Sequence, residues 1–302
     1  MPNKVSIPDP EEGVKFIDVH CHLPFPRPKK NDRLPSDEEQ YKNYFELGGV
    51  YLITSSIDNF TLDLILKFIK DKQNIGFSIG WAPQTVTYTP KNEYNNYWNK
   101  WVKYIMESQE KCVAIGEIGL DFHHAQTLEK REKQVSELKK IFEITKSFDK
   151  PYILHVRNAA QHEYDRDNPK HRYNNKDGAT KEILNLIQEY NLDPQKIMWH
   201  CFSGPEEYGT LLPKEGFKLS VPSSAYGIKR WRDATQKSPL ESLLTETDSY
   251  YQHPYLRGPL NVPSNVRYSI AAIAYSHQTS QKIVSEKTVK NAIEFFKLDI
   301  NI

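Results

Sequence analysis

Residues 14–22 read Val-Lys-Phe-Ile-Asp-Val-His-Cys-His, a short run rich in apolar and β-branched residues that ends on polar side chains. Such a run is typical of a strand, and we expect one over Val14–His20. Successive side chains of a strand point to opposite sides, so His20 and His22 should point to the same side. The run therefore predicts a strand that presents two imidazoles together at its end.

Seven similar runs follow along the chain, which gives eight expected strands. The other seven cover Val50–Ser55, Ile75–Gly80, Cys112–Glu117, Tyr152–Val156, Lys196–His200, Phe217–Val221 and Ser242–Asp248. Most alternate with segments whose apolar residues recur at helical spacing, although the link between residues 221 and 242 is less clearly helical. Alternation of this kind implies a parallel sheet, and 302 residues suit one (β/α)₈ TIM barrel.

The composition is compatible with a single α/β domain over residues 1–302, beginning with a polar extension at residues 1–13. That extension is too polar for the apolar core of a signal peptide, and no apolar run approaches the length of a membrane span. The three cysteines, Cys21, Cys112 and Cys201, argue against a disulfide framework. We therefore expect a cytoplasmic protein that has no membrane partner.

Three connections between expected elements are long, namely Pro24–Phe45, Trp81–Trp101 and Arg157–Thr180. We interpret them as loops, and long loops in compact domains are usually functional. Each follows an expected strand, which places it on the face of a barrel where active sites are built. These connections are expected to form walls of a substrate site.

Imidazoles and carboxylates fall at the ends of five of the expected strands. They are Asp18, His20, His22, Glu117, His155, His200 and Asp248. The C-terminal ends of barrel strands converge on one rim, so these side chains should meet in one pocket. His20, His22, Glu117, His155, His200 and Asp248 are more ligands than one tetrahedral site can use. The pattern predicts two divalent metal ions, with a carboxylate such as Glu117 bridging them.

Five blocks of sequence resemble, in order and spacing, the signature blocks of the TatD family of metal-dependent deoxyribonucleases. They are Asp-Val-His-Cys-His-Leu at 18–23, Gly-Glu-Ile-Gly-Leu-Asp at 116–121, Leu-His-Val-Arg at 154–157, His-Cys-Phe-Ser-Gly at 200–204 and Thr-Glu-Thr-Asp at 245–248. The resemblance runs from about Phe16 to Phe296. It implies an amidohydrolase-type barrel, two divalent ions and hydrolysis of the phosphodiester bonds of DNA.

The resemblance also implies roles for single residues. His20, His22 and Asp248 would hold one ion, His155 and His200 the other, and Glu117 would bridge them. The implied reaction is attack by a metal-bridged hydroxide, with Glu117 and Asp248 as catalytic residues and Asp248 also accepting a proton. Asp18 and Glu246 would orient the ligands. Four imidazoles favour Zn²⁺ or Mn²⁺ as the ions, and the family suggests Mg²⁺ as well.

One segment departs from the family pattern. The family usually has Gly-x-His-Pro-His after the third strand, whereas this chain reads Gly-Trp-Ala-Pro-Gln at 80–84, so Ala82 and Gln84 replace both histidines. In the family this segment lies over the substrate. The nature of the substrate is therefore less securely implied than the metal site.

Substrate contacts are expected from basic and aromatic residues that follow the strands. We single out Arg157, Lys229, Arg230, Trp231 and Arg257; a further basic group occupies residues 27–33. Cationic side chains attract phosphates, and an aromatic plane can stack on a base, which is a common way to hold single-stranded nucleic acid. Because Lys and Arg (40) nearly balance Asp and Glu (39), such affinity must come from local patches. We expect DNA as the partner, as single strands or ends attacked by an exonuclease.

Two other functions stay open at this point. A hydrolase of a small ester, lactone or amide on the same fold would account for the missing histidines at Ala82 and Gln84. A protein whose metals are only structural would bind them without turnover, and its site would have no open position.

Overall fold

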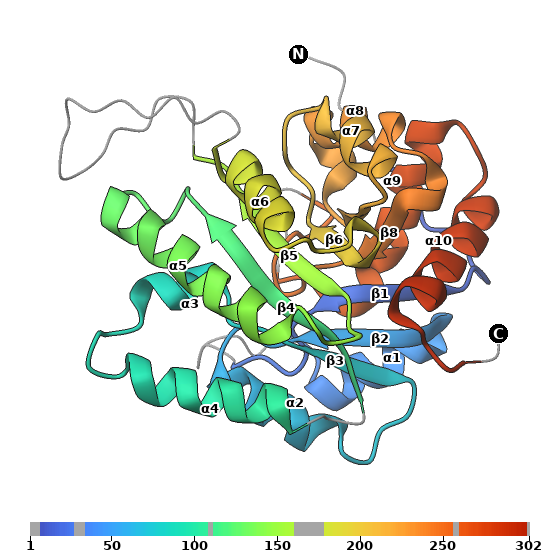
Figure 1. Ribbon diagram of the computed structural model, residues 1–302. Coiled ribbons are helices and arrows are strands. Elements are labelled where there is room, and N and C mark those ends of the chain that lie inside the picture. Colours follow the sequence, from blue (N-terminus) through green and yellow to red (C-terminus); the bar gives the residue numbers. More distant parts are fainter. Residues whose placement is uncertain (1–6, 27–33, 108–110, 160–177, 256–259, 301–302) are drawn as a thin grey trace.

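The computed structural model describes residues 7–26, 34–107, 111–159, 178–255 and 260–300. Its centre is a sheet of eight parallel strands in which each strand pairs with its neighbours in sequence (Figure 1). The strands are β1 (Phe16–Cys21), β2 (Gly49–Ser55), β3 (Ile75–Ile79), β4 (Cys112–Asp121), β5 (Tyr152–Arg157), β6 (Ile197–His200), β7 (Lys218–Pro222) and β8 (Leu243–Glu246). The backbone N–H of Asp248 donates to the carbonyl of His20 (2.9 Å), which joins the last strand to the first. The expected (β/α)₈ barrel is confirmed.

Helices surround the strands on the outside of the barrel (Figure 1). They are α1 (Asp37–Glu46), α2 (Asn59–Ile69), α3 (Pro83–Tyr88), α4 (Tyr94–Met106), α5 (Leu128–Thr145), α6 (Gly178–Glu189), α7 (Tyr208–Lys214), α8 (Lys229–Lys237), α9 (Val266–His277) and α10 (Gln281–Phe296). The uncertain link between residues 221 and 242 contains α8. Across the described part of the chain, none of these helices combines the length and apolarity needed to cross a bilayer.

Two of the long connections interpreted as loops contain helices, so that expectation is wrong for them. Residues 24–45 include most of α1, which begins at a capping box in which Ser36 and Glu39 exchange hydrogen bonds with each other's backbone N–H. Tyr44 of α1 is fully buried. The third connection, residues 157–180, lies mostly outside the described residues. The capping box and the buried ring of Tyr44 therefore stabilise α1, a helix in a segment that the sequence predicts to be a loop.

The second connection folds because its aromatic residues pack together. The ring of Trp81 stacks on that of Tyr94 at 5.4 Å, and Trp98 stacks on Trp101 at 5.6 Å. Trp101 is 1% exposed, and α4 carries these rings at helical spacing. These aromatics therefore fasten α4 to the barrel through the end of β3.

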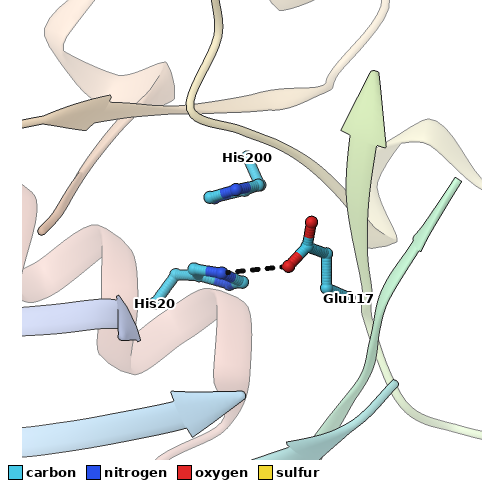
Figure 2. Close-up of side chains that lie close together, drawn as sticks. All are labelled: His20, Glu117 and His200. Carbon is cyan, nitrogen blue, oxygen red and sulfur yellow. Dashed lines mark ion pairs between the residues drawn. The ribbon is translucent and has the colours of Figure 1, made fainter. Parts of the chain in front are cut away.

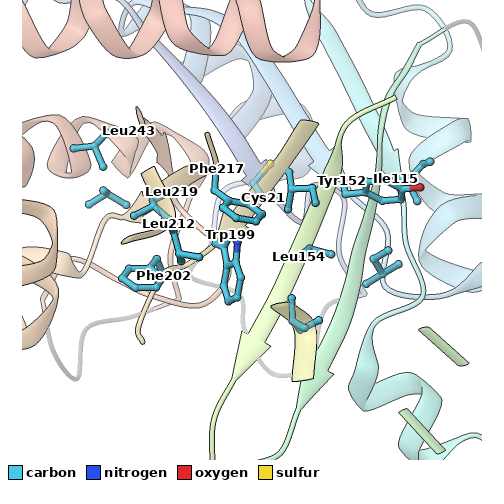
Figure 3. Close-up of a cluster of buried hydrophobic side chains, with 14 of the residues drawn as sticks. Cys21, Ile115, Tyr152, Leu154, Trp199, Phe202, Leu212, Phe217, Leu219 and Leu243 are labelled. Carbon is cyan, nitrogen blue, oxygen red and sulfur yellow. The ribbon is translucent and has the colours of Figure 1, made fainter. Parts of the chain in front are cut away.

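Apolar side chains on both sides of the strands form the core. Outside the sheet, Trp199, Leu219 and Phe217 belong to a large cluster together with Leu212 of α7 (Figure 3). A second cluster draws on six strands and α10, and contains Ile17, Val19, Ile53, Ala114, Ile153, Met198, Leu244, Val289, Ala292, Phe295, Phe296 and Leu298. Because six strands contribute to it, this second cluster fills the inside of the barrel.

The inner cluster determines where two site residues point. His155 lies two residues after Ile153 on β5, and His200 lies two residues after Met198 on β6. Side chains two residues apart on a strand share a face, so both imidazoles point into the barrel, above the apolar cluster. Strand periodicity thus delivers both rings to the C-terminal mouth.

Gly119 of β4 makes room for β5 at that mouth. Its φ is +142°, and a Cβ atom there would lie 2.1 Å from the carbonyl oxygen of His155, its partner in the strand register. We expect Gly119→Ala to lower the free energy of unfolding by roughly 1–3 kcal/mol, because it adds backbone strain and a steric clash. Urea unfolding measures this loss. Gly13→Ala is the control, because Gly13 also has positive φ (+76°) but no atom within 4 Å of the added Cβ; equal losses in both variants would contradict the packing argument.

Candidate metal centre

The six predicted ligands converge at the C-terminal mouth of the barrel. His20 Nε2 lies 3.6 Å from Glu117 Oε2 and 3.8 Å from Asp248 Oδ1. The ring of His200 stacks over that of His20 with centroids 3.8 Å apart, and the carboxylate of Glu117 reaches toward both rings (Figure 2). Among the described residues, two groups have ligand atoms close enough to hold an ion, one of His20, Glu117 and His200 and the other of His20, His22 and Asp248.

The end of β2 orients the two histidines of the first block. The Nδ1 of His22 lies 2.9 Å from the carbonyl oxygen of Ser55, and the Nδ1 of His20 lies 3.0 Å from the hydroxyl of Ser55. A carbonyl only accepts hydrogen bonds, so Nδ1 of His22 carries a proton and donates it to Ser55. The Nε2 of His22 lies 3.3 Å from Asp248 Oδ1. Ser55 therefore turns the Nε2 atom of His22 toward the centre of the site.

His155 lies between two carboxylates. Its Nδ1 is 2.6 Å from Glu117 Oε1, and its Nε2 is 3.0 Å from Asp121 Oδ2, four residues further along β4. Asp121 also accepts hydrogen bonds from the side chains of Gln84 (2.7 Å) and His124 (2.8 Å). A carboxylate on the far nitrogen of a metal-binding histidine fixes the orientation and protonation of the ring. Asp121 thus leaves Nδ1 of His155 as the atom that faces the site.

The two residues expected to orient ligands act in different ways. Glu246 Oε2 accepts a hydrogen bond from Nδ1 of His200 at 2.8 Å, so it contacts a ligand ring directly. The buried Asp18 accepts hydrogen bonds from the backbone N–H (3.0 Å) and hydroxyl (2.5 Å) of Thr247. Thr247 precedes Asp248, so Asp18 acts on the position of that ligand through the backbone.

The donor set fits a cation. His20 is fully buried, and its Nε2 has no hydrogen-bond partner among the described residues although two carboxylates lie within 4 Å. A buried polar atom without a partner is costly, and a metal ion would satisfy it. Imidazole and carboxylate together are the ligands of Zn²⁺ and Mn²⁺.

Charges in the site are tightly balanced. Burial alone would raise the pKa of Glu117, but the charge and the hydrogen bond of His155, together with the charge of His200, hold it well below its ordinary value. Burial would likewise lower the pKa of both His155 and His200, but the neighbouring carboxylates raise these to about 10 and about 9. Burial and the nearby His200 lower the pKa of His20. Glu117 is therefore ionised, and the protonated rings of His155 and His200 balance its charge in the protein without a bound ion.

A cavity of about 430 Å³ opens directly onto these ligands. Its walls include His22, Glu117, His155, His200 and Asp248 together with Gln84 and Thr85 of α3, Arg157, Arg230, Tyr251 and Gln252. The second long connection thus supplies part of the wall, through α3. A structural metal site is closed to water and substrate, whereas this one adjoins an open cavity.

The residues predicted to bind substrate divide into three groups. Arg157 and Arg230 are exposed and line the cavity. Lys229 lies on the exposed side of α8, where it pairs with Asp233, and is not among the residues that line the cavity, so its role in substrate binding stays a prediction. Trp231 backs the cavity wall but is 6% exposed and packs in the core, so it has no open face for a base to stack on. Arg257 and residues 27–33 lie outside the described residues.

Sequence reasoning assigned no role to Ser55, Asp121 or Gln84, yet each contacts a ligand or the partner of one. The signal for Ser55 was its place at the end of an expected strand, where side chains meet the rim. Asp121 belongs to the second sequence block, but expecting β4 to end at Glu117 hid its position on the same rim. Gln84 was seen only as a missing histidine. Its contact with Asp121 depends on α3, a helix in a segment that the sequence predicts to be a loop.

An eight-stranded barrel with imidazoles and carboxylates gathered at its C-terminal mouth defines the class of barrel hydrolases that use metal ions. The family model described as TatD related DNase matches residues 17–297, so the chain belongs to this family. The chain is 26% identical over 286 residues to an uncharacterized metal-dependent hydrolase of Methanocaldococcus jannaschii, covering 94% of this chain and 98% of that protein. The resemblance drawn from the five sequence blocks is confirmed.

Two further comparisons are with a solved structure and with a relative whose name states an activity. A solved hydrolase of the TatD family from Entamoeba histolytica superimposes with a TM-score of 0.76 at 18% identity, covering 94% of this chain and 99% of that one. The human deoxyribonuclease TATDN3 is 27% identical over 190 residues, covering 62% of this chain and 61% of that protein. The first similarity supports the barrel fold alone.

Removal of the Asp121 carboxylate is expected to weaken metal binding while the fold is kept. In Asp121→Asn the ring of His155 loses a charged partner, and such losses typically reduce metal affinity about 10- to 100-fold. Titration of the metal-free protein with Zn²⁺ against a chelating indicator measures the affinity. Asp63→Asn, which alters a carboxylate bonded to Lys100 at the surface, should bind as the parent does; unchanged affinity in Asp121→Asn would contradict the role.

Metal uptake is expected to release protons and to strengthen as the pH rises. The pKa values of His155 and His200, about 10 and about 9, mean that both rings are protonated at neutral pH without an ion, and a nitrogen that binds a metal gives up its proton. Affinity should therefore fall as the pH is lowered from about 9. Calorimetry of Zn²⁺ binding in buffers of different ionisation enthalpy counts the protons; an enthalpy independent of the buffer would be inconsistent with this charge balance.

Proposed function

We propose that the chain is a metal-dependent hydrolase that cleaves phosphodiester bonds of DNA. The observation that carries the proposal is the buried Nε2 of His20, which has no hydrogen-bond partner in the described part of the chain although it lies near Glu117, Asp248 and His22 beside an open cavity. Six donors around one point, facing an open cavity, suit catalysis better than a structural metal.

Two divalent ions, Zn²⁺, Mn²⁺ or Mg²⁺, would be held by the converging donors. His20, His22 and Asp248 would hold one, His155 and His200 the other, and Glu117 would bridge them. When bound, such ions lower the pKa of a water and neutralise charge that develops on phosphoryl oxygens. Asp18 and Glu246 would keep Asp248 and His200 in place through the hydrogen bonds described above.

Asp248 is the proposed proton acceptor. Its side chain is 12% exposed and lines the cavity, and Oδ1 lies 3.3 Å from His22 Nε2. Burial would raise the pKa of Asp248, but the hydrogen bond from His22 and the charges of His200 and His22 lower it. The carboxylate is therefore ionised at neutral pH and can accept the proton of an attacking water. Glu117 lies deeper and holds its neighbours rather than meeting solvent.

Phosphate groups of the substrate would be held by Arg157 and Arg230, which reach the cavity from β5 and α8. Guanidinium groups bind phosphate oxygens through paired hydrogen bonds. DNA as the substrate is supported by membership of the TatD related DNase family and by the name of the human relative, a deoxyribonuclease. We expect single strands or strand ends as the substrate. The ligands lie inside the mouth of the barrel, at a cavity of about 430 Å³, and a single strand or an end can enter such a cavity more readily than an intact duplex.

Hydrolysis of a small ester, lactone or amide is the second candidate. The observation that favours it is Gln84, which stands where the family has a histidine and donates to Asp121 at the cavity wall. This substitution changes the side of the cavity where a substrate would lie without altering the six donors.

The nuclease proposal is tested with Asp248→Asn, His155→Ala and chelation of the metal. Loss of the proton acceptor is expected to lower the rate of cleavage of single-stranded DNA about 100- to 10,000-fold, and chelation should abolish cleavage until metal is restored. Gel analysis of end-labelled oligonucleotides measures the rate, and circular dichroism checks that the variants fold. Asp149→Asn, at an exposed carboxylate that pairs with Lys196 and Lys297, is the control.

Full activity of Asp248→Asn or His155→Ala would refute the proposed centre. A metal-loaded protein that leaves DNA intact and hydrolyses members of an ester and lactone panel would replace the first candidate by the second.

A further inference from the structure

Tyr251 is an unusually exposed aromatic residue at the edge of the metal centre. Its side chain is 56% exposed and lines the same cavity as His22 and Asp248. Its ring lies 6.4 Å from the ring of His22, at an interplanar angle of 81°. A large ring that remains in solvent beside a reaction site offers a face on which a planar group can stack.

The backbone around Tyr251 is held in place on both sides. The N–H of Tyr251 donates to the carbonyl of Asp248 at 2.7 Å. The carbonyl of Gln252 accepts from the hydroxyl of Ser223 at 2.6 Å and from the side-chain amide of Asn261 at 3.2 Å. The exposed ring therefore sits on a fixed segment directly after a proposed ligand, so little conformational freedom is lost when it binds.

A second ring completes a corner beside His22. Phe25 lies 6.4 Å from Tyr251 at an angle of 79°, and 6.2 Å from His22. Behind it stands the buried ring of Tyr250 at 5.5 Å, whose hydroxyl lies 3.1 Å from the carboxylate of Asp37. A planar group stacked on Tyr251 would meet Phe25 edge to face, which is a favoured aromatic geometry.

Charge and aromatic surface lie on different parts of the cavity rim. Arg157 ends β5 and Arg230 lies in the first turn of α8 after β7, whereas Tyr251 follows β8 and its neighbour Phe25 follows β1. The ligands lie beside both groups at the barrel mouth, because they come from β1, β4, β5, β6 and the end of β8. A nucleotide presents the same division, with a charged phosphate on one side of its sugar and an aromatic base on the other.

We propose that Tyr251 and Phe25 form a platform on which the nucleobase next to the scissile phosphate stacks, while Arg157 and Arg230 hold the phosphate backbone. This inference rests on the proposed function, and it moves the stacking surface from the buried Trp231, which follows β7, to the exposed Tyr251, which follows β8. It identifies the substrate as a strand with an unpaired base at the site, because a base within a duplex has no free face.

The test compares binding of a short oligothymidylate with binding of a chain of the same length and charge that has abasic sugars throughout. Fluorescence anisotropy with end-labelled strands and the full-length protein in a chelating buffer measures affinity without turnover. Tyr251→Ala should weaken binding of oligothymidylate about tenfold and leave the abasic chain unaffected, because one base–aromatic stack is lost. Tyr251→Phe keeps the ring and should bind within about twofold of the parent.

Tyr275→Ala is the matched control, since Tyr275 is 50% exposed on α9 and lies outside the cavity of the metal centre. It should change neither affinity. Equal affinity of the parent for both strands, or an equal effect of Tyr251→Ala on both, would overturn the platform. Hydrolysis of bis(p-nitrophenyl) phosphate by the metal-loaded parent, measured in parallel, separates the two proposals, because this activity needs no base stacking and its loss would count against the proposed function instead.

Discussion

The buried carboxylate of Glu117 is the constraint on which the site depends. It is 4% exposed, and an ionised carboxylate at that depth is stable only when positive charge surrounds it. His155 Nδ1 supplies such a partner at 2.6 Å, and His20 Nε2 lies 3.6 Å from the carboxylate on the β1 side of the barrel mouth. Glu117 lies on β4, so the neighbouring strand β5 must bring His155 to it and β1 must bring His20 to it across the barrel mouth.

The seam between the first and last strands carries half of the ligands. Asp248 N–H donates to the carbonyl of His20, and His22 N–H donates to the carbonyl of Ser249, both at 2.9 Å. The carboxylate of Asp18 adds two hydrogen bonds to Thr247. The contacts that close the barrel are thus the same contacts that set the spacing of His20, His22 and Asp248. Stability of the fold and geometry of the site are linked at this seam.

Much of this arrangement could be predicted from sequence because strand periodicity and barrel topology are strong rules. The eight strands follow from short apolar runs that alternate with helical segments. The meeting of His20, Glu117 and His200 follows from their places at the ends of those strands. The rest depends on contacts between elements. From the sequence, Trp231 is expected to stack on a base, but α8 places its ring in the core. Asp121 reaches the site because β4 extends four residues beyond Glu117.

The departures from the family pattern also gain a physical meaning only in three dimensions. Gln84 is a missing histidine in the sequence, but in the structure its amide donates to the carboxylate that holds His155. The helix α3 that places it could not be expected from a segment with little helical periodicity. Local composition fixes which groups are available, whereas long-range packing decides which of them meet.

Anomalous diffraction from crystals soaked in Mn²⁺ or Zn²⁺ tests the central claim most directly. The account predicts two peaks at the barrel mouth, one beside His20, His22 and Asp248 and the other beside His155 and His200, with Glu117 between them. Absence of metal from this cluster under saturating conditions, or peaks confined to surface carboxylates, would contradict it.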